Sequence, residues 1–255
     1  MLLVKIIWRI LRQKILRCFG IIMGRHFSHM PDHLVVIAPH PDDEVFGCAG
    51  LIAQSKGNGK KSEIIFLTQG DASHQHCCNV STDQVGSWRR ELADKAAKVL
   101  GVSHKQFRFL SGKDANLPRK DSDMFVTMAT EICQALKLTT PEAVFCPHPF
   151  EGWPDHIAAT ELTVAAIKML PEALRPRLYY YCVWSWYSMP LRRFFELNWE
   201  KAFLLDISRQ LHLKRQAKSI YLDTLAPCGN PWVGKLPKGF LRAFEWDKEL
   251  FFEAD

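Results

Sequence analysis

The stretch VVIAPHPDDE (residues 35–44) places a dense polar cluster directly after a run of apolar residues. The apolar residues have the pattern of a buried β-strand, and the polar residues begin where that strand would end. In open α/β sheets the carboxyl ends of the strands face the ligand-binding crevice. We therefore expect this polar cluster to take part in the chemistry of the protein.

The rest of the chain predicts an α/β fold, because short β-rich runs alternate with longer helical stretches after Pro31. This is the pattern of a parallel sheet with crossover helices. Strands are predicted at residues 33–38, 63–68, 107–110, 143–146 and 178–184, and helices at about 44–56, 84–100, 122–138 and 155–169. Farther on, residues 202–207 are a candidate strand, 208–224 a candidate helix and 226–239 a loop. We predict a single domain over residues 31–255.

The net charge of +6 is concentrated at one end of the chain. Residues 1–31 contain six basic residues and no acidic residue, which leaves 27 Lys plus Arg against 27 Asp plus Glu in the remainder. Phosphate binding needs a clustered basic surface on the domain itself. A nucleic-acid-binding protein is therefore not expected.

Residues 1–30 are predicted to form a separate basic, amphipathic segment. On a helix, Ile7, Leu11, Ile15, Cys18 and Ile22 would share one stripe, and Lys5, Arg9, Arg12 and Gln13 the opposite one. No apolar run reaches the length of about 18 residues expected of a spanning helix. Two interpretations stay open: residues 1–24 lie in an anionic membrane surface, or they pack on the domain or extend from it.

The eight cysteines include no C-x-x-C pair, and several lie inside apolar runs. This pattern is typical of reduced, buried thiols in a cytoplasmic protein rather than of a disulfide framework. The predicted location is the cytoplasm, with peripheral contact at the inner face of the cytoplasmic membrane as the alternative.

A metal site is predicted from two polar clusters. His40 and Asp43, separated by two residues across a strand-to-helix turn, can point at one metal ion. Catalytic zinc needs three protein ligands and keeps a fourth position open. The stretch CPHPFEGWPDH (residues 146–156) follows another predicted strand, so we predict His156 as the third ligand. Asp42, next to these ligands, could then accept a proton from the water that attacks a carbonyl.

Each of these residues taken alone has a simpler explanation. Asp42 and Asp43 belong to a residue type favoured at helix N-termini whatever the function. His156 could be an ordinary, partly buried histidine near a helix start. The presence of two such clusters, each directly after a predicted strand, favours the metal site.

The segment PHPDDE (residues 39–44) resembles the signature of the PIG-L/LmbE-like deacetylases, and WPDH (residues 153–156) resembles their second motif, usually His-Pro-Asp-His. The resemblance covers about residues 33–225. It implies a Rossmann-like, three-layer α/β sandwich with a mostly parallel sheet. It also implies zinc-dependent hydrolysis of an N-acetyl amide on an amino sugar.

Carried over to this chain, the resemblance assigns metal binding to His40, Asp43 and His156, and the general base to Asp42. The metal would be Zn²⁺, although two histidines and an aspartate accept other divalent metals. Arg89 lies where the family has a substrate-contacting arginine, with the adjacent Arg90 as the alternative.

Trp153 departs from the family pattern, because the first histidine of the second motif is expected there. That histidine is thought to stabilise the oxyanion or to protonate the leaving amine, and one missing electrostatic donor can cost about 100- to 1000-fold in rate. Three explanations stay open: His148 takes over the missing role, the metal and another donor suffice, or most activity is lost.

The predicted function is removal of acetyl from an N-acetylglucosamine-type sugar, on a lipid-linked glycan if residues 1–24 hold the enzyme at a membrane. One alternative is a metal-dependent amidase that acts on a non-sugar amide. The other, kept open by Trp153, is a weakly active or non-catalytic relative that binds glycans or membranes.

Overall fold

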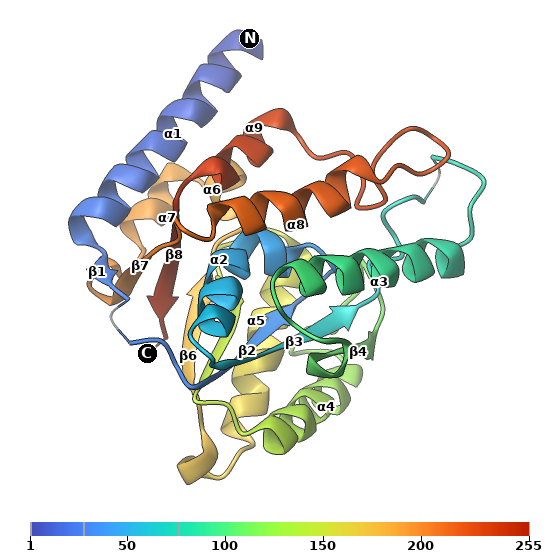
Figure 1. Ribbon diagram of the computed structural model, residues 1–255, viewed down its shortest axis with the longest axis vertical. Coiled ribbons are helices and arrows are strands. Elements are labelled where there is room, and N and C mark those ends of the chain that lie inside the picture. The colour runs from blue at the N-terminus through green and yellow to red at the C-terminus, as the bar shows by residue number, and fades with distance from the viewer. Residues whose placement is uncertain (1, 28, 76, 255) are drawn as a thin grey trace.

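The computed structural model describes residues 2–27, 29–75 and 77–254 and contains one eight-stranded sheet (Figure 1). Its strands are β1 (Arg25–His26), β2 (His33–Ala38), β3 (Lys61–Thr68), β4 (Phe107–Gly112), β5 (Ala143–Pro147), β6 (Arg177–Tyr181), β7 (Ala202–Asp206) and β8 (Lys248–Glu253). They are arranged in the order β1-β7-β8-β6-β5-β2-β3-β4. Neighbouring strands are parallel except where β8 pairs with β6 and β7.

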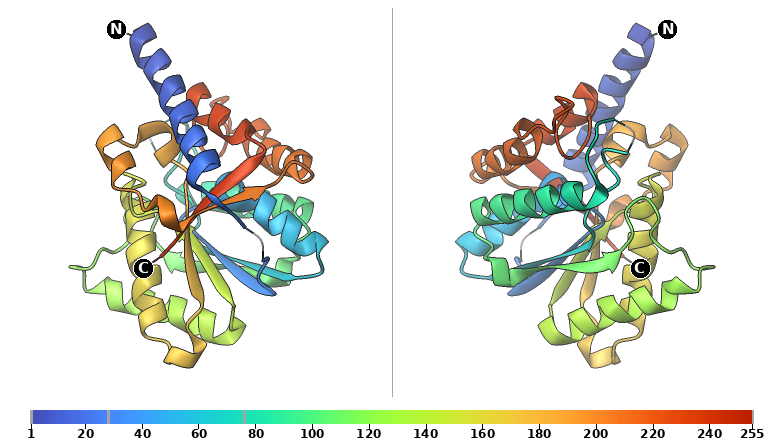
Figure 2. Two further views of the ribbon diagram at one scale, coloured as in Figure 1. Left: turned by 90° about the vertical axis from the view of Figure 1, so that its left-hand side faces the viewer. Right: turned by 90° about the vertical axis from the view of Figure 1, so that its right-hand side faces the viewer.

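Helices cover both faces of this sheet, as Figures 1 and 2 show. The longer ones are α1 (Leu2–Met23), α2 (Asp43–Gly57), α3 (Thr82–Val99), α4 (Met124–Thr139), α5 (Pro154–Lys168) and α8 (Leu211–Asp223); α6 (Ser185–Ser188), α7 (Leu191–Phe195) and α9 (Lys238–Leu241) are short. Helices α2, α3 and α8 pack together on one face, and α4 and α5 on the other.

The core is divided into two apolar layers because β2 is buried on both faces. Leu34 and Val36 point into the layer beneath α2, whereas Val35 and Ile37 point into the layer beneath α4 and α5. A strand buried on both faces has a continuous apolar sequence, which is why no alternation of apolar and polar residues is found here. The predicted three-layer, mostly parallel α/β fold is therefore confirmed.

The sheet has a topological switch point between β2 and β5. From β2 the chain proceeds through β3 to the edge strand β4, and it then returns to the other side of β2 to build β5 and β6. Ligands of doubly wound sheets bind outside the carboxyl ends of the strands at such a point. The two polar clusters of the sequence follow these two strands and therefore lie beside each other.

The predicted helices before residue 170 agree with α2, α3, α4 and α5 within two residues at each end. The strand predicted at 178–184 was too long, since β6 ends at Tyr181. The backbone N–H groups of Val183 and Trp184, shortly after this end, donate to the carboxylate of Glu151 (2.9 and 2.6 Å) instead of to a neighbouring strand. The helix predicted at 208–224 begins only at Leu211, and β1 and β8 were not predicted.

The basic N-terminal segment forms a helix whose first half projects from the body of the protein (Figures 1 and 2). Its second half packs through the face that carries Arg12, Gln13 and Leu16. Arg12 and Gln13 are buried, and they donate to the backbone carbonyls of Met189 (2.9 Å) and Gly239 (2.7 Å). The helix is thus docked on the domain, and the following residues 25 and 26 join the sheet beside β7.

The opposite, apolar stripe of α1 is left largely uncovered. Leu11 is 44% and Ile22 76% exposed, Cys18 is also exposed, and Ile15 is partly buried. Among the described residues, no helix has the length and apolar character needed to cross a membrane.

Candidate active site

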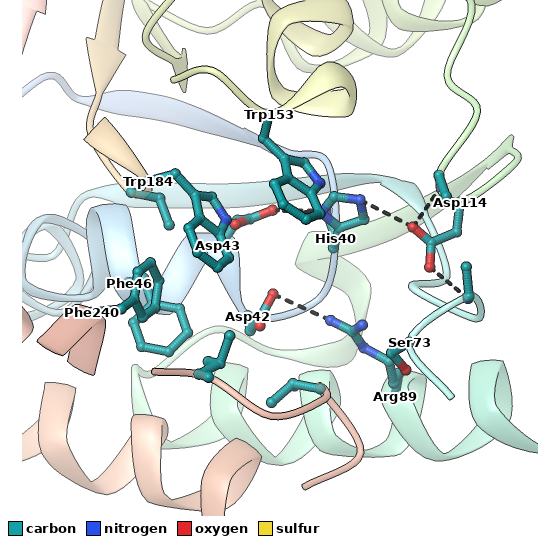
Figure 3. Close-up of a pocket in the computed structure, with 15 residues that line it drawn as sticks. His40, Asp42, Asp43, Phe46, Ser73, Arg89, Asp114, Trp153, Trp184 and Phe240 are labelled. Carbon is teal, nitrogen blue, oxygen red and sulfur yellow. Dashed lines mark hydrogen bonds and ion pairs between the residues drawn. The ribbon is translucent and has the colours of Figure 1, made fainter. Parts of the chain in front are cut away.

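The three predicted metal ligands meet at the switch point. His40 and Asp43 lie on the turn from β2 into α2, and His156 lies in the first turn of α5. His40 Nδ1 is 3.1 Å from Asp43 Oδ2, and His156 Nε2 is 3.3 Å from Asp43 Oδ1. Two segments more than one hundred residues apart in the chain thus form one cluster (Figure 3 shows His40 and Asp43).

The donor atoms of this cluster fit a divalent cation. One ligand atom from each of His40, Asp43 and His156 lies within 4.8 Å of the others. Ligand atoms about 2.0–2.1 Å from a tetrahedral zinc ion are about 3.3 Å apart, close to the two distances found here. His156 is fully buried, and its Nε2 forms no hydrogen bond of normal geometry, although Asp43 Oδ1 lies within ion-pair distance. A fully buried nitrogen that faces a carboxylate without a well-formed hydrogen bond is placed to share a cation with it, which favours a metal ligand.

Glu151 orients His156 from behind. Its carboxylate is fully buried and lies 3.2 Å from His156 Nδ1. The same carboxylate accepts hydrogen bonds from the backbone N–H groups of residues 183–185 and from the Ser185 hydroxyl. A histidine that donates one ring N–H to a fixed carboxylate presents the other nitrogen to a metal. Glu151 therefore points Nε2 of His156 toward Asp43.

Asp155 and Asp114 hold His40 in the same manner. His40 Nε2 lies 3.1 Å from a carboxylate oxygen of each. Asp155 also accepts from the backbone N–H groups of Ala115 and Leu117, and Asp114 from that of Ala72. His40, Asp114 and Asp155 are themselves close enough to bind a metal. The carboxylates of Asp114 and Asp155, however, already accept hydrogen bonds from backbone N–H groups. This arrangement leaves Nδ1 of His40 for the cation.

The charged side chains of this cluster shift one another's pKa values. Burial alone would lower the pKa of His156, but the carboxylates of Asp43 and Glu151 raise it to about 9. Burial alone would raise the pKa of Asp43, but contact with His156 and His40 lowers it well below the usual range. Asp43 and His156 would hold a cation in place of this ion pair, and His156 would then give up its extra proton.

Asp42 lies at the edge of the cluster in a conformation that non-glycine residues rarely adopt. Its φ is 136°, and its backbone N–H donates to Glu44 Oε2 (2.9 Å), which helps to hold the turn. Burial raises the pKa of Asp42 to about 7, although the guanidinium of Arg89, 3.2 Å from Oδ1, opposes the rise. A carboxylate with a pKa near neutrality is suited to general-base chemistry.

Arg89, rather than Arg90, faces the site. Arg89 is 4% exposed and donates to the backbone carbonyl of Gly70 (3.0 Å) and to that of Pro41, whereas Arg90 is exposed. Gly70 has a φ of +66°, and a Cβ at this position would lie 2.4 Å from Arg89 Cζ. Glycine is therefore required for Arg89 to reach Asp42 (Figure 3).

A pocket opens above these polar groups, with aromatic and aliphatic side chains on its walls. Trp153 and Trp184 stack at 5.1 Å with an interplanar angle of 12°, and Figure 3 shows the two rings side by side at the pocket. Trp153 is 46% exposed, so its ring remains accessible to a ligand. The apolar wall is completed by Phe46, Phe240, Val233 and Leu236, and polar groups are added by Ser73 and Asp114.

His148 is not among the residues that line this pocket. Its ring packs against Phe150, Tyr180 and Phe252, and its Nδ1 accepts a hydrogen bond from the backbone N–H of Phe150 (3.0 Å). Burial lowers its pKa to about 4, so the ring is neutral near pH 7. The structure therefore does not bring His148 to the other predicted site residues.

Three carboxylates of the site, those of Asp114, Glu151 and Asp155, had no predicted role. Glu151 and Asp155 lie inside the second polar cluster, where a carboxylate near a predicted ligand histidine is the signal that could have found them. Asp114 lies in the loop after β4 and has no such neighbour in the sequence.

Fold and site together define a doubly wound α/β protein with a candidate His/Asp cation site at its switch point. The sequence model of the PIG-L family, described as GlcNAc-PI de-N-acetylase, matches residues 35–167, just over half of the chain. The protein belongs to this family. Deacetylases of the family depend on a metal, in agreement with the donor set found here.

Two curated relatives and one solved structure illustrate the relationship. A probable N-acetyl-alpha-D-glucosaminyl L-malate deacetylase 2 of Bacillus subtilis is 27% identical over 58% of this chain and 66% of its own length. A 1D-myo-inositol 2-acetamido-2-deoxy-alpha-D-glucopyranoside deacetylase of Corynebacterium kroppenstedtii is 31% identical over 56% of this chain and 43% of its own. A conserved protein of Thermus thermophilus is similar in structure, with a TM-score of 0.61, 27% identity and coverage of 84% of this chain and 85% of that one.

Proposed function

We propose that this protein is a metal-dependent hydrolase that removes the acetyl group from an N-acetylated amino sugar, with Zn²⁺ as the metal. The observation that carries the proposal is the position of Asp42, a buried carboxylate with a pKa of about 7 beside the donor set of His40, Asp43 and His156. The names of the two curated relatives support an acetamido sugar as the substrate class.

In the proposed reaction, the amide carbonyl of the substrate lies between the donor set and Asp42. A divalent cation, when bound, polarises this carbonyl and makes water a better nucleophile. Asp42 accepts the proton of the attacking water, and Arg89 holds the Asp42 carboxylate in place from 3.2 Å. The C–N bond then breaks, and acetate and a free amine leave.

The departing amine needs a proton, and Asp42 is placed to return the one that it accepted. Its pKa of about 7 allows both steps near neutral pH. No role for His148 is needed in this scheme. Trp153 instead serves as part of an aromatic wall with Trp184 on which the apolar face of a sugar ring packs.

The proposal is tested by incubation of the zinc-loaded protein with a panel of N-acetylglucosamine conjugates and with matched non-sugar acetamides. The measured products are free amine and acetate in equal amounts. Release from sugar conjugates alone is expected. Equal release from the non-sugar acetamides would instead favour an amidase, and no release from any substrate by zinc-loaded protein would contradict catalysis.

We also propose that the uncovered stripe of α1 contacts an anionic membrane surface and places the pocket near lipid-linked substrates. Leu11 and Ile22 are exposed on this stripe, and Lys14 and Arg25 are exposed near it. Sedimentation with vesicles that contain anionic lipid tests the contact. Wild-type protein is expected to sediment and the Leu11→Glu/Ile22→Glu variant to stay in the supernatant; equal sedimentation of the two would contradict the contact.

A further inference from the structure

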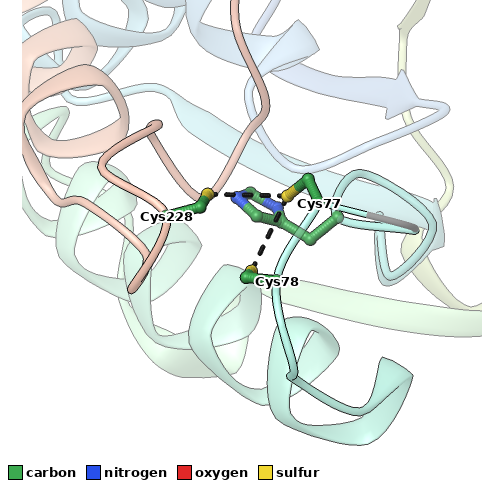
Figure 4. A group of neighbouring side chains, drawn as sticks. Cys77, Cys78 and Cys228 are labelled. Carbon is green, nitrogen blue, oxygen red and sulfur yellow. Dashed lines mark hydrogen bonds between the residues drawn. The ribbon is translucent and has the colours of Figure 1, made fainter.

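Four side chains outside the active site gather between two loops, and Figure 4 labels the three cysteines among them. His74, Cys77 and Cys78 lie on the loop between β3 and α3, and Cys228 lies on the loop between α8 and α9. The sulfur of Cys77 is 3.6 Å from that of Cys78 and 3.5 Å from that of Cys228. One potential ligand atom from each of the four lies within 4.8 Å of the others.

The spacing of the sulfurs fits a tetrahedral metal site. Zinc binds thiolate sulfur at about 2.3 Å, which places two sulfurs of a tetrahedral site about 3.8 Å apart. A disulfide would instead bring two sulfurs to about 2.05 Å and leave the third thiol and the imidazole without a role. Three thiols and one imidazole form a Cys₃His set, a combination typical of structural zinc.

The hydrogen bonds of His74 leave one ring nitrogen free to bind a metal. The hydroxyl of Ser73 donates to the carbonyl of Trp232 (2.8 Å), so its oxygen can only accept at His74 Nδ1, 3.1 Å away. Nδ1 therefore carries the proton, and Nε2 keeps its lone pair. His74 is 3% exposed, and this Nε2 has no hydrogen-bond partner. A buried, unprotonated nitrogen without a partner beside three thiols is an independent indication of a ligand.

The surroundings of the thiols also suit a metal. Cys77 is exposed and Cys78 and Cys228 are partly exposed, so an ion can reach them from solvent. The side-chain amide of Asn230 donates to the sulfur of Cys228 (3.5 Å), a contact that stabilises a thiolate.

We propose that His74, Cys77, Cys78 and Cys228 bind a second zinc ion, distinct from the one at the switch point. The three cysteines bind as thiolates, so their protons are released to solvent when zinc binds. The site joins two loops that each line the active-site pocket, one through Ser73 and the other through Val233 and Leu236. The second ion thus fixes one wall of the pocket without contacting the reacting atoms.

The test is the number of zinc ions bound per chain, measured on full-length protein after loading with zinc and removal of the excess. Two ions are expected for wild type and one for the Cys77→Ser/Cys228→Ser variant. The Cys18→Ser variant is the matched control, because Cys18 is an exposed cysteine on α1, and it should still bind two. Circular dichroism establishes that each variant is folded.

Cobalt substitution separates the two sites by their ligands. Thiolate-to-cobalt charge-transfer absorption is expected in wild type and in His156→Ala, and it should be absent from Cys77→Ser/Cys228→Ser. This readout does not depend on catalytic activity, so failure of the proposed deacetylation would leave it unchanged. The proposal is overturned if the double variant binds as much zinc as wild type, or if the zinc-loaded, denatured chain shows six reactive thiols instead of eight.

Discussion

Two groups of residues are candidates for metal binding, but the chain builds them in different ways. We call them the switch-point cluster, which comprises His40, Asp43 and His156, and the loop cluster, which comprises His74, Cys77, Cys78 and Cys228. His40, Asp43 and His156 follow two strands that are neighbours in the sheet, and they are mostly or fully buried. The loop cluster depends on the approach of two segments that no strand pairing brings together, and Cys77 and Cys228 are 151 positions apart in the chain. A site at strand ends is fixed by the fold itself, whereas a site between loops depends on contacts such as the hydrogen bond from Ser73 to Trp232, to which a bound ion would add.

The two clusters also differ in their donors. The switch-point cluster offers two imidazoles and one carboxylate, with further carboxylates behind them, and this leaves a coordination position for substrate or water. The loop cluster offers four donors, which fill a tetrahedral site. We therefore predict that an ion at the switch-point cluster takes part in catalysis, whereas an ion at the loop cluster stabilises the fold.

Loss of a switch-point ligand has the largest expected effect. His156→Ala should reduce deacetylation by at least about 10³-fold, because the cation contributes several kcal/mol of transition-state stabilisation. The measurement is kcat/KM together with the zinc content, which should fall by one ion per chain. Retention of two ions by His156→Ala would show that His156 is not a ligand of the switch-point cation.

Asp42→Asn should leave both ions in place but reduce kcat by about 10²- to 10⁴-fold, the usual contribution of a general base. Asparagine keeps the shape of the side chain and its contact with Arg89 but cannot accept the proton. Steady-state kinetics and zinc content measure the two effects separately. Near-normal kcat would remove Asp42 from the proposed chemistry.

Glu151→Gln is expected to weaken zinc binding at the switch point by about 10- to 100-fold, because His156 loses the carboxylate that orients it. Competition with a metal chelator gives the affinity, and the cobalt–thiolate absorption of the loop cluster serves as the internal control. A loss of affinity at the loop cluster as well would indicate general misfolding.

The pH dependence should follow Asp42. The base works as a carboxylate, so kcat/KM should be constant above its pKa and fall tenfold for each pH unit below it. Burial raises this pKa to about 7 without metal, and a bound cation favours the carboxylate, so the fall should begin below pH 7. An unchanged midpoint in the residual activity of Asp42→Asn would assign the fall to another group.

The smallest effect on activity is expected at the loop cluster. Cys228→Ser should lower the midpoint of thermal unfolding of the zinc-loaded protein by about 5 °C, since the protein loses the stabilisation that a bound ion supplies. Its kcat/KM should stay within about tenfold of wild type. Cys18→Ser should match wild type in both measurements.

The central part of the fold could be predicted because its strands are buried on both faces and therefore appear as uninterrupted apolar runs, as in β2 and β5. The metal ligands could be predicted because they directly follow those strands. By contrast, β8 was missed, since its antiparallel place between β6 and β7 depends on contacts that no local pattern shows.

The parts of the sites that escaped prediction depend on tertiary contacts of loops. Glu151 has its role because the chain after β6 turns its N–H groups toward it. The loop cluster exists because Cys228 approaches Cys77, and the spacing of the cysteines alone indicated only buried thiols. The apolar stripe of α1 was predicted, but the helix packs through another face, on which Arg12 and Gln13 donate to backbone carbonyls of the domain and Leu16 joins the core.

The most direct measurement is anomalous diffraction at the zinc absorption edge from crystals of the zinc-loaded protein. We predict a strong peak about 2.0–2.2 Å from Nδ1 of His40, a carboxylate oxygen of Asp43 and Nε2 of His156. No peak there, with the three side chains still paired to one another in the presence of excess zinc, would contradict a cation site at the switch point.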